Sequence, residues 1–302
     1  MKTLAVVIPN WNGLEDTRAL LPTLARCRVP EGWRVRAIVV DNGSRDGSAG
    51  VLAREFPDVE VLSLLENRRF AGGCNAGLER ALGAGADAAM LLNNDTEADP
   101  GLVEKLLLAL EEDPRAGAAA PLICFKEPLD VVWYAGGQLS PALGLAAHRG
   151  LREYDRGQYR SVEPTGYLTG CCLLATRAAW ETVGLLDERY FIYAEDADWC
   201  LRARRAGFRL LFVPTARLWH KVSASSGATS PWKIYQRLRA NLTLFARHAR
   251  GLARVTWLPC FLAQQAALAA WLLARGRGAA ATAVPRALWD ALVRKPAGEV
   301  KL

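Results

Sequence analysis

The chain has 302 residues, of which 51% are hydrophobic and 23% charged, so it can build a sizeable core and is not a disordered protein. At roughly 100–200 residues per domain, this length predicts two domains or one large domain with an appendage. The net charge of +7 is uneven: residues 231–302 carry 12 Lys or Arg and 2 acidic residues, whereas residues 1–230 carry 26 basic and 29 acidic residues. A basic tail on a near-neutral body indicates an anionic partner for the tail, either nucleic acid or a membrane surface.

Short apolar runs alternate with helical patterns along the first 120 residues. We expect strands at residues 4–8, 35–40, 59–65 and 88–92, and helices at residues 16–24, 47–56, 75–82 and 100–112. This order predicts an α/β fold with a doubly wound, mostly parallel sheet.

Polar clusters follow three of these strands, at residues 9–13, 41–44 and 93–95. Turn chemistry alone can account for Asn and Gly in any one cluster. Parallel sheets bind ligands beyond the carboxyl ends of their strands, however, so three clusters at one edge predict a site there.

The middle of the chain is less regular. Strands and loops are expected over residues 126–164, a short helix at 177–183, a helix at 196–206 and a strand at 208–213. Glu195, Asp196 and Asp198 stand together here, framed by aromatic residues. Acidic runs are usually solvated, but carboxylates in apolar surroundings can have raised pKa values and serve as bases.

The seven cysteines contain no Cys-x-x-Cys pair, which favours reduced, buried thiols in a cytosolic protein. The apolar run at residues 4–9 is too short for a signal peptide. We therefore expect a cytoplasmic location.

Six motifs follow one another in the first 222 residues. They are VVIPNWNG (6–13), VVDNGSRDGS (39–48), NRRFAGGCNAG (67–77), LLNNDT (91–96), GLLDERYF (184–191) and EDADWCLR (195–202). In this order they resemble family 2 glycosyltransferases with the GT-A fold, in particular the rhamnosyltransferase-like branch, over about residues 3–222. The resemblance implies a glycosyltransferase domain at 1–230, with a nucleotide-sugar-binding half (1–120) and an acceptor-binding, catalytic half (121–230), followed by a helical tail at 231–302.

The resemblance also assigns roles to matching residues. Asp196 matches the catalytic base, and Asp95 with His220 matches the ligands of a divalent cation, Mg²⁺ or Mn²⁺, bound to the donor diphosphate. The nucleotide-sugar site would contain Pro9, Asn12, Asp41, Asn67, Gly73 and Asn94, with Asp41 on the nucleotide base. Glu195, Asp198 and Trp199 would orient the acceptor or its loop, with Trp199 stacking on a sugar ring. Because Asn93 stands where this motif usually begins with Asp, the metal site has one charge fewer.

The implied activity is that of an inverting hexosyltransferase in cell-surface polysaccharide biosynthesis. Its donor would be dTDP-L-rhamnose, or otherwise a UDP-sugar, and its acceptor a hydroxyl of a glycan or lipid-linked glycan. A sugar-nucleotide nucleotidyltransferase is an alternative, but its G-x-G-T-R loop would stand where residues 9–13 read PNWNG. A membrane-docked, glycan-binding pseudoenzyme is a second alternative, which the presence of Asp41, Asp95 and Asp196 argues against.

The tail contains 20 uncharged residues, 255–274, between Arg254 and Arg275. This length can just span a bilayer, although Pro259 and six alanines disfavour a span. Tryptophans near basic residues suit a helix lying in the membrane interface, and a helical cap packed on the body is the other interpretation. Because the tail is alanine-rich and carries no nucleic-acid motif, we expect an anionic membrane surface as partner and no nucleic acid. The enzyme would then be peripheral at the inner face of the cell membrane.

Overall fold

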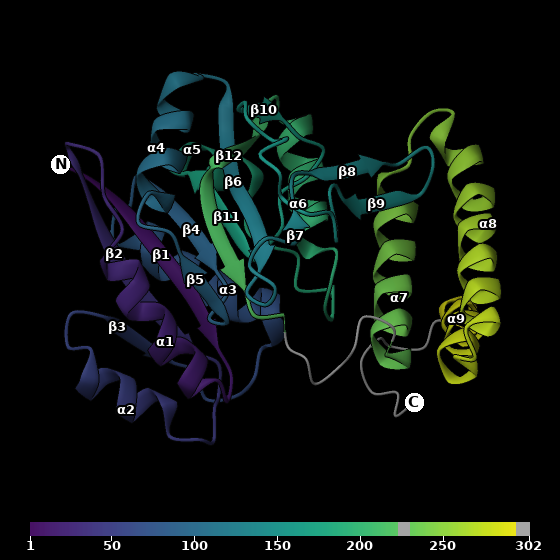
Figure 1. Ribbon diagram of the computed structural model, residues 1–302, viewed down its shortest axis with the longest axis horizontal. Coiled ribbons are helices and arrows are strands. Elements are labelled where there is room, and N and C mark those ends of the chain that lie inside the picture. The colour runs from purple at the N-terminus through teal and green to yellow at the C-terminus, as the bar shows by residue number, and fades with distance from the viewer. Residues whose placement is uncertain (223–229, 294–302) are drawn as a thin grey trace.

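The computed structural model describes residues 1–222 and 230–293 and is built on one ten-stranded sheet (Figure 1). Four neighbouring strands are parallel, in the order β3-β2-β1-β4. Their bounds are β1 (Lys2–Asn10), β2 (Trp33–Asp41), β3 (Glu60–Ser63) and β4 (Ala88–Leu92). The helices between and after them are α1 (Leu14–Ala25), α2 (Ser48–Glu55), α3 (Arg69–Gly83) and α4 (Leu102–Glu112). This part of the sheet confirms the predicted parallel, doubly wound arrangement.

The second half of the body extends the same sheet. β11 (Cys172–Thr176) pairs antiparallel with β4, and β6 (Ala116–Phe125) then pairs parallel with β12 (Arg209–His220). The remaining short strands on this side are β5 (Thr96–Ala98), β7 (Val132–Tyr134) and β10 (Glu163–Pro164). Helices α5 (Arg177–Val183) and α6 (Glu195–Arg205) precede β12. The two halves therefore share one continuous hydrogen-bonded sheet. The boundary that was predicted between them, at residue 120, falls inside β6.

Helix α3 begins at Arg69, six residues before the predicted start. Gly73 and Gly77 lie inside it because the helix packs too closely for a side chain. A Cβ at residue 77 would lie 2.3 Å from Val7 Cγ1 of β1, and one at residue 73 would lie 2.8 Å from Asn42 Nδ2. Gly73 precedes the predicted helix and Gly77 lies inside it, and both are sites of close packing.

Strand β12 continues past Pro214 to His220, whereas the sequence predicted its end at residue 213. Its pairing with β6 shifts register between Val213 and Arg217, and this irregularity accommodates the proline, which has no N–H to donate. The extension carries His220 to the strand pair β12·β5, opposite Thr96.

Three helices form the C-terminal tail: α7 (Pro231–His248), α8 (Ala253–Ala274) and α9 (Gly278–Leu292). Figure 1 shows α7 between the body and α8. The hairpin of β8 (Gly137–Ser140) and β9 (Leu145–His148) reaches from the body to α8. Thr256 donates to the Ala142 carbonyl and Gln264 to the Leu143 carbonyl, both at 2.8 Å. The tail is therefore joined to the body by side-chain contacts as well as by the chain itself.

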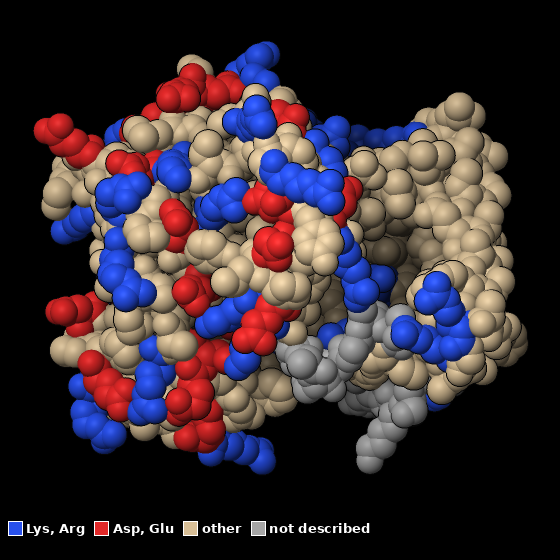
Figure 2. All heavy atoms as spheres, in the orientation of Figure 1, with Lys and Arg blue, Asp and Glu red and all other residues tan. Residues whose placement is uncertain are grey.

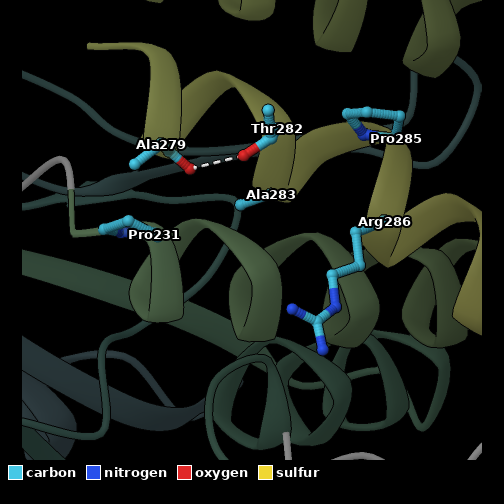
Figure 3. Close-up of a pocket in the computed structure, with 6 residues that line it drawn as sticks. All are labelled: Pro231, Ala279, Thr282, Ala283, Pro285 and Arg286. Atoms are coloured by element: carbon cyan, nitrogen blue, oxygen red, sulfur yellow. Dashed lines mark hydrogen bonds between the residues drawn. The ribbon is translucent and has the colours of Figure 1, made fainter. Parts of the chain in front are cut away.

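A cavity of about 550 Å³ lies between the start of α7 and α9 (Figure 3). Its lining consists of Pro231, Ala279, Thr282, Ala283, Pro285 and Arg286. The Thr282 hydroxyl is engaged with the Ala279 carbonyl at 2.9 Å. Of the described residues that line the cavity, Arg286 is a cation and none is a carboxylate. They offer no general base, so the cavity is not the candidate active site.

Candidate active site

The three polar strand ends meet at Asn10, the buried last residue of β1. Its amide nitrogen donates to Asp41 Oδ1 at the end of β2 (3.1 Å). Its side-chain oxygen, Oδ1, accepts from Thr17 Oγ1 (2.9 Å) and from Asn94 Nδ2 (3.2 Å). The structure thus confirms that the clusters share one sheet edge. The Asn94 side-chain amide donates into this network, and its hydrogen bonds hold the loop after β4 to the loop after β1.

The loops after β1 and β2 are also tied to each other. The Asn12 backbone N–H donates to Ser44 Oγ (2.9 Å), and Asn12 Oδ1 accepts from the Arg45 N–H (2.8 Å). Pro9 lies inside β1, in register with Val40. These contacts give the edge beside Asp41 a fixed backbone.

Asn67 and Gly73 are brought together by Asn42, which sequence reasoning did not single out. Asn42 Nδ2 donates to Asn67 Oδ1 (3.2 Å) and to the Arg69 carbonyl (2.9 Å), and Asn42 Oδ1 accepts from the Arg68 N–H (2.9 Å). The start of α3 is therefore fixed against the end of β2. The position of Asn42, two residues after a predicted strand, is the signal that could have identified it.

Asp95 and His220 lie side by side, with Nε2 of the imidazole 3.1 Å from Oδ1 of the carboxylate. Burial opposes ionisation of Asp95, but the contact with His220 outweighs it and holds the pKa of this carboxyl below its usual value. Nearby, the buried Asn93 Oδ1 has no hydrogen-bond partner among the described residues.

This pair suits a divalent cation held partly by substrate. A separation of 3.1 Å fits two adjacent ligands of one octahedral ion with bonds of about 2.0–2.1 Å. In the described part of the chain no third His, Cys, Asp or Glu joins them. Mg²⁺ commonly binds through one or two carboxylates plus substrate phosphates and water, so two protein ligands are a chemically sufficient set.

Asp196 lies in the first turn of α6, half-buried, with its carboxylate oriented by two backbone donors. The Gly170 N–H donates to Oδ2 (2.8 Å) and the Ala197 N–H to Oδ1 (2.7 Å). Burial raises the pKa of Asp196 although these two donors act in the opposite direction. The result is an oriented carboxylate with increased basicity, as a general base requires.

Glu195, the neighbour of Asp196, is buried and its Oε2 has no hydrogen-bond partner among the described residues. Burial, and then the charge of Asp196, raises the pKa of Glu195 to about 8. It is therefore protonated at neutral pH, which leaves the negative charge of the pair on Asp196.

Asp198 is fully buried and faces the tail. It accepts hydrogen bonds from Tyr190 (3.1 Å), Arg202 Nε (2.8 Å) and His248 Nε2 of α7 (2.7 Å). Arg205 lies 2.6 Å from the other imidazole nitrogen of His248, so that nitrogen is the acceptor and Nε2 carries the proton. These partners are all side chains of the protein itself. Asp198 therefore orients the Tyr190 loop and fixes α7 to α6.

Trp199 is also fully buried, so the expectation that it stacks on a sugar ring is wrong. Its ring packs on Trp180 with centroids 4.6 Å apart, and Nε1 donates to the Gly184 carbonyl (2.8 Å). The ring is therefore enclosed by the core and cannot reach an acceptor.

A single loop connects the candidate metal ligands with the candidate base. The Asn93 N–H donates to the Cys171 carbonyl (2.9 Å), and the next residue back, Gly170, contacts Asp196. Cys171 is buried between the two sites: burial raises the pKa of its thiol, and the charges of Asp95 and Asp196 raise it further. Asp95 and Asp196 thus flank one short segment at the carboxyl edge of the sheet.

Comparison with known proteins decides the family. The sequence profile described as Glycosyl transferase family 2 matches residues 5–184, more than half of the chain. The chain belongs to this family. Its fold agrees, because the mostly parallel α/β sheet matches GT-A structures.

Several relatives of this family 2 chain are named as sugar transferases. An N-acetylglucosaminyl-diphospho-decaprenol L-rhamnosyltransferase of Mycobacterium tuberculosis is 33% identical over 212 residues, which cover 64% of this chain and 68% of that protein. The dTDP-rhamnosyl transferase RfbF of Shigella flexneri is 23% identical over 70% of this chain and 71% of its own.

Two solved structures show the same fold. The mannosyltransferase PcManGT of Pyrobaculum calidifontis, in complex with GDP-Man and Mn²⁺, has a TM-score of 0.62 at 17% identity over 97% of this chain and 87% of that chain. GalNAc-T7, with UDP, GalNAc and Mn²⁺, has a TM-score of 0.60 at 18% identity over 81% of this chain, which spans about half of that protein, 47%. The chain is accordingly a family 2 glycosyltransferase.

Proposed function

We propose that the protein transfers a sugar from a nucleotide-activated donor to a hydroxyl of a lipid-linked glycan, with inversion at the anomeric carbon. The observation that carries this proposal is Asp196, a single oriented carboxylate one short loop away from the Asp95–His220 pair. We take dTDP-L-rhamnose as the donor and a sugar linked through diphosphate to a polyprenol as the acceptor. The names of the relatives in M. tuberculosis and S. flexneri support both choices.

Asp196 would remove the proton from the acceptor hydroxyl as its oxygen attacks the anomeric carbon. The new glycosidic bond forms while the bond to the nucleotide diphosphate breaks on the opposite face of the sugar. A single base without a covalent intermediate implies inversion. Asp41 would accept a hydrogen bond from the nucleotide base, and Pro9, Asn12, Asn67 and Gly73 would border the donor.

Asp95 and His220 would hold a divalent cation, Mg²⁺ or Mn²⁺. Such an ion, when bound, neutralises charge on the leaving diphosphate. The proposal is supported by the 3.1 Å separation of the two side chains and by the Mn²⁺ named with PcManGT and GalNAc-T7.

The transfer itself is tested with the full chain, dTDP-L-rhamnose, Mg²⁺ and a synthetic N-acetylglucosaminyl-diphospho-farnesol. We expect one dTDP released for each rhamnose transferred, and NMR of the product should show the inverted anomeric configuration. A product of retained configuration would contradict a single-base mechanism. Transfer from UDP-sugars alone would overturn the donor assignment.

Asp95→Asn should abolish the part of donor binding that depends on Mn²⁺. At 100 times its Kd a ligand stabilises a protein by about 2.7 kcal/mol, which is about 5–10 °C in Tm at this size. We expect this shift for the wild type with dTDP-L-rhamnose and Mn²⁺, and only the metal-free shift for Asp95→Asn. Asp113→Asn removes a carboxylate that pairs with Arg209 and serves as the control. An identical wild-type shift in Mn²⁺ and in EDTA would argue against the metal site.

We also propose that the enzyme is cytoplasmic and peripheral at the inner face of the cell membrane, with α8 lying in the membrane interface. Among the described residues α8 is the one helix whose length and composition would allow a membrane span, and only 11% of its most apolar window is buried. Val255, Leu258, Leu262 and Leu273 recur at helical spacing along one side and are exposed. Arg254 and Arg275 flank them, as suits an anionic surface.

Leu258→Glu/Leu262→Glu should weaken binding to phosphatidylglycerol-containing vesicles by about 100-fold in a sedimentation assay. Burying a leucine side chain is worth about 1.5–3 kcal/mol, so the pair contributes roughly 3 kcal/mol or more. Leu65→Glu, at a fully exposed leucine after β3, is the matched control. Unchanged binding by the double variant would contradict the interfacial orientation. These point variants are preferable to truncation after Ser230, because removing α7 would leave Asp198 buried without His248.

A further inference from the structure

Two cations on α7, Lys233 and Arg237, lie one helical turn apart without an acidic partner among the described residues. No hydrogen bond or ion pair of either side chain is found there, and no Asp or Glu occurs between Asp198 and Asp290 in the sequence. Lys233 is half-buried, and burial together with the charge of Arg237 lowers the pKa of its ammonium group. Like charges at this spacing repel each other, so the fold keeps an unfavourable pair that an anion would neutralise.

The pair is on the catalytic side of α7. The positive charge of Arg237 acts on His148 of β9, on Tyr167 and on Tyr193, and the charge of Asp196 acts on the same Tyr167. His248 at the other end of α7 is bound to Asp198 in α6, so α7 is fixed beside the helix that carries Asp196. Arg237 and Asp196 therefore both act on Tyr167, and α7 lies beside α6.

The side chains between the anionic Asp196 and the two cations are uncharged and polar. Burial lowers the pKa of His148 to about 4, so its imidazole is neutral at pH 7. Its Nδ1 lies 3.1 Å from the Trp133 carbonyl and carries the proton, which leaves Nε2 as a hydrogen-bond acceptor. A sugar ring, with hydroxyls to donate, matches this neutral zone.

Figure 2 shows the molecule hollowed between the body and the tail, with neutral side chains on the tail wall and Lys or Arg side chains along the edge next to the body. In the same orientation α7 runs between the body and α8 (Figure 1). The exposed apolar side chains of α8 belong to the same tail. The hollow therefore lies where α7, the helix that carries Lys233 and Arg237, runs between the body and α8.

We propose that Lys233 and Arg237 form an anion subsite that binds the diphosphate of the lipid-linked acceptor, with its sugar toward Asp196 and its polyprenyl chain along α8. The inference rests on the proposed transfer to a lipid-linked acceptor and specifies how that acceptor is held. Such a molecule would offer a sugar hydroxyl to the carboxylate, a neutral ring to the polar side chains, a diphosphate to the two cations and an apolar chain to the exposed side chains of α8. A charge-assisted hydrogen bond from each cation provides the affinity.

Direct binding tests the subsite independently of catalysis. The probes are farnesyl diphosphate and farnesol, titrated into the full chain in neutral detergent, with EDTA present to keep the diphosphate off a metal site. We expect Lys233→Ala/Arg237→Ala to weaken farnesyl diphosphate binding by about 100-fold, at about 10-fold or more per charge-assisted hydrogen bond, and to leave farnesol binding unchanged. The matched control is Arg250→Ala/Arg254→Ala, which removes two positive charges at the same spacing from an exposed part of the tail.

Equal affinity of the wild type for farnesyl diphosphate and farnesol would overturn the subsite, as would an equal loss in the control variant. A second outcome would also contradict the subsite: Lys233→Ala/Arg237→Ala binds farnesyl diphosphate normally and loses only its binding to phosphatidylglycerol vesicles. The two cations would then bind lipid headgroups. In the transfer assay the same variant should raise the acceptor KM by a similar factor and leave the donor KM unchanged. If farnesyl diphosphate binds through these residues and no nucleotide sugar is used, the subsite stands and the proposed transfer is wrong.

Discussion

Asp196→Asn should lower kcat by about 10²–10⁴-fold, the range that general-base catalysis typically contributes, with the donor KM within a few-fold of the wild type. The amide keeps the size of the carboxylate and can still accept the Gly170 N–H, so the fold and the donor site are preserved. It cannot take up the acceptor proton. Steady-state kinetics with separate donor and acceptor titrations measure the effect.

Glu195→Gln is the control for this variant, because it changes the adjacent carboxyl and spares the base. Glu195 is neutral at pH 7 in the folded chain, so an uncharged amide should leave kcat within a few-fold of the wild type. Full activity of Asp196→Asn, or a loss in Glu195→Gln as large as in Asp196→Asn, would contradict the assignment of Asp196 as the base.

Glu195→Gln should also change the pH dependence of the free energy of unfolding, in a direction that the raised pKa of Glu195 determines. The pKa of Glu195 is about 8 in the folded protein and about 4.3 in the unfolded chain, so the folded state binds more protons between these values. Wild-type stability therefore falls as the pH rises through this window, whereas that of Glu195→Gln does not. The stability of Glu195→Gln relative to the wild type should thus increase from pH 5 to pH 8.

Asp198→Ala should destabilise the protein by about 3–5 kcal/mol, because it leaves buried cationic and polar partners without their carboxylate. Arg202, His248 and Tyr190 each lose a hydrogen bond, and of the contacts between α6 and α7 only those of Arg205 with His248 are kept among these side chains. At this chain length the loss corresponds to a Tm lower by roughly 10 °C, measurable by calorimetry or urea denaturation. His248→Ala should cost less in the Asp198→Ala background than in the wild type, since the interaction that the two residues share is already lost there.

The pH dependence follows from the depressed pKa of Asp198. Burial raises this pKa, but the hydrogen bonds from His248 and Arg202 outweigh burial and lower it. The stabilisation is therefore fully present above the unfolded pKa of about 3.9 and is lost as the pH falls through the lower folded value. The difference between wild type and Asp198→Ala should shrink only under strongly acidic conditions.

Asp16→Ala is the comparison that separates a buried network from a surface ion pair. Asp16 pairs with Lys221 at 2.7 Å, and both side chains are partly exposed. Exposed pairs contribute about 0–1 kcal/mol, so Asp16→Ala should change the free energy of unfolding by less than 1 kcal/mol. Equal effects of the two substitutions would show that Asp198 does not hold the tail to the body.

Sequence periodicity identified the parallel half of the sheet and the edge at which Asn10, Asp41 and Asn94 meet. Buried parallel strands are continuous apolar runs, and their ends are marked by polar turn residues, so both signals are local in the chain. The ordered motifs then identified the family and pointed to Asp95, Asp196 and His220. The start of α3 was predicted too late because the glycines near its beginning, which close packing requires, have low helix propensity.

Only the tertiary structure decided what each acidic residue of the 195–198 run contacts. The helical period of α6 directs Asp196 to the open edge, Glu195 into the core and Asp198 toward His248, fifty residues away in the chain. No local pattern encodes that pairing, since it depends on how α7 packs. The sequence by itself determined the family, the sheet and the uneven charge. The tertiary packing decided that Asp198 fixes α7 to α6 through His248 and that Trp199, packed on Trp180, belongs to the core.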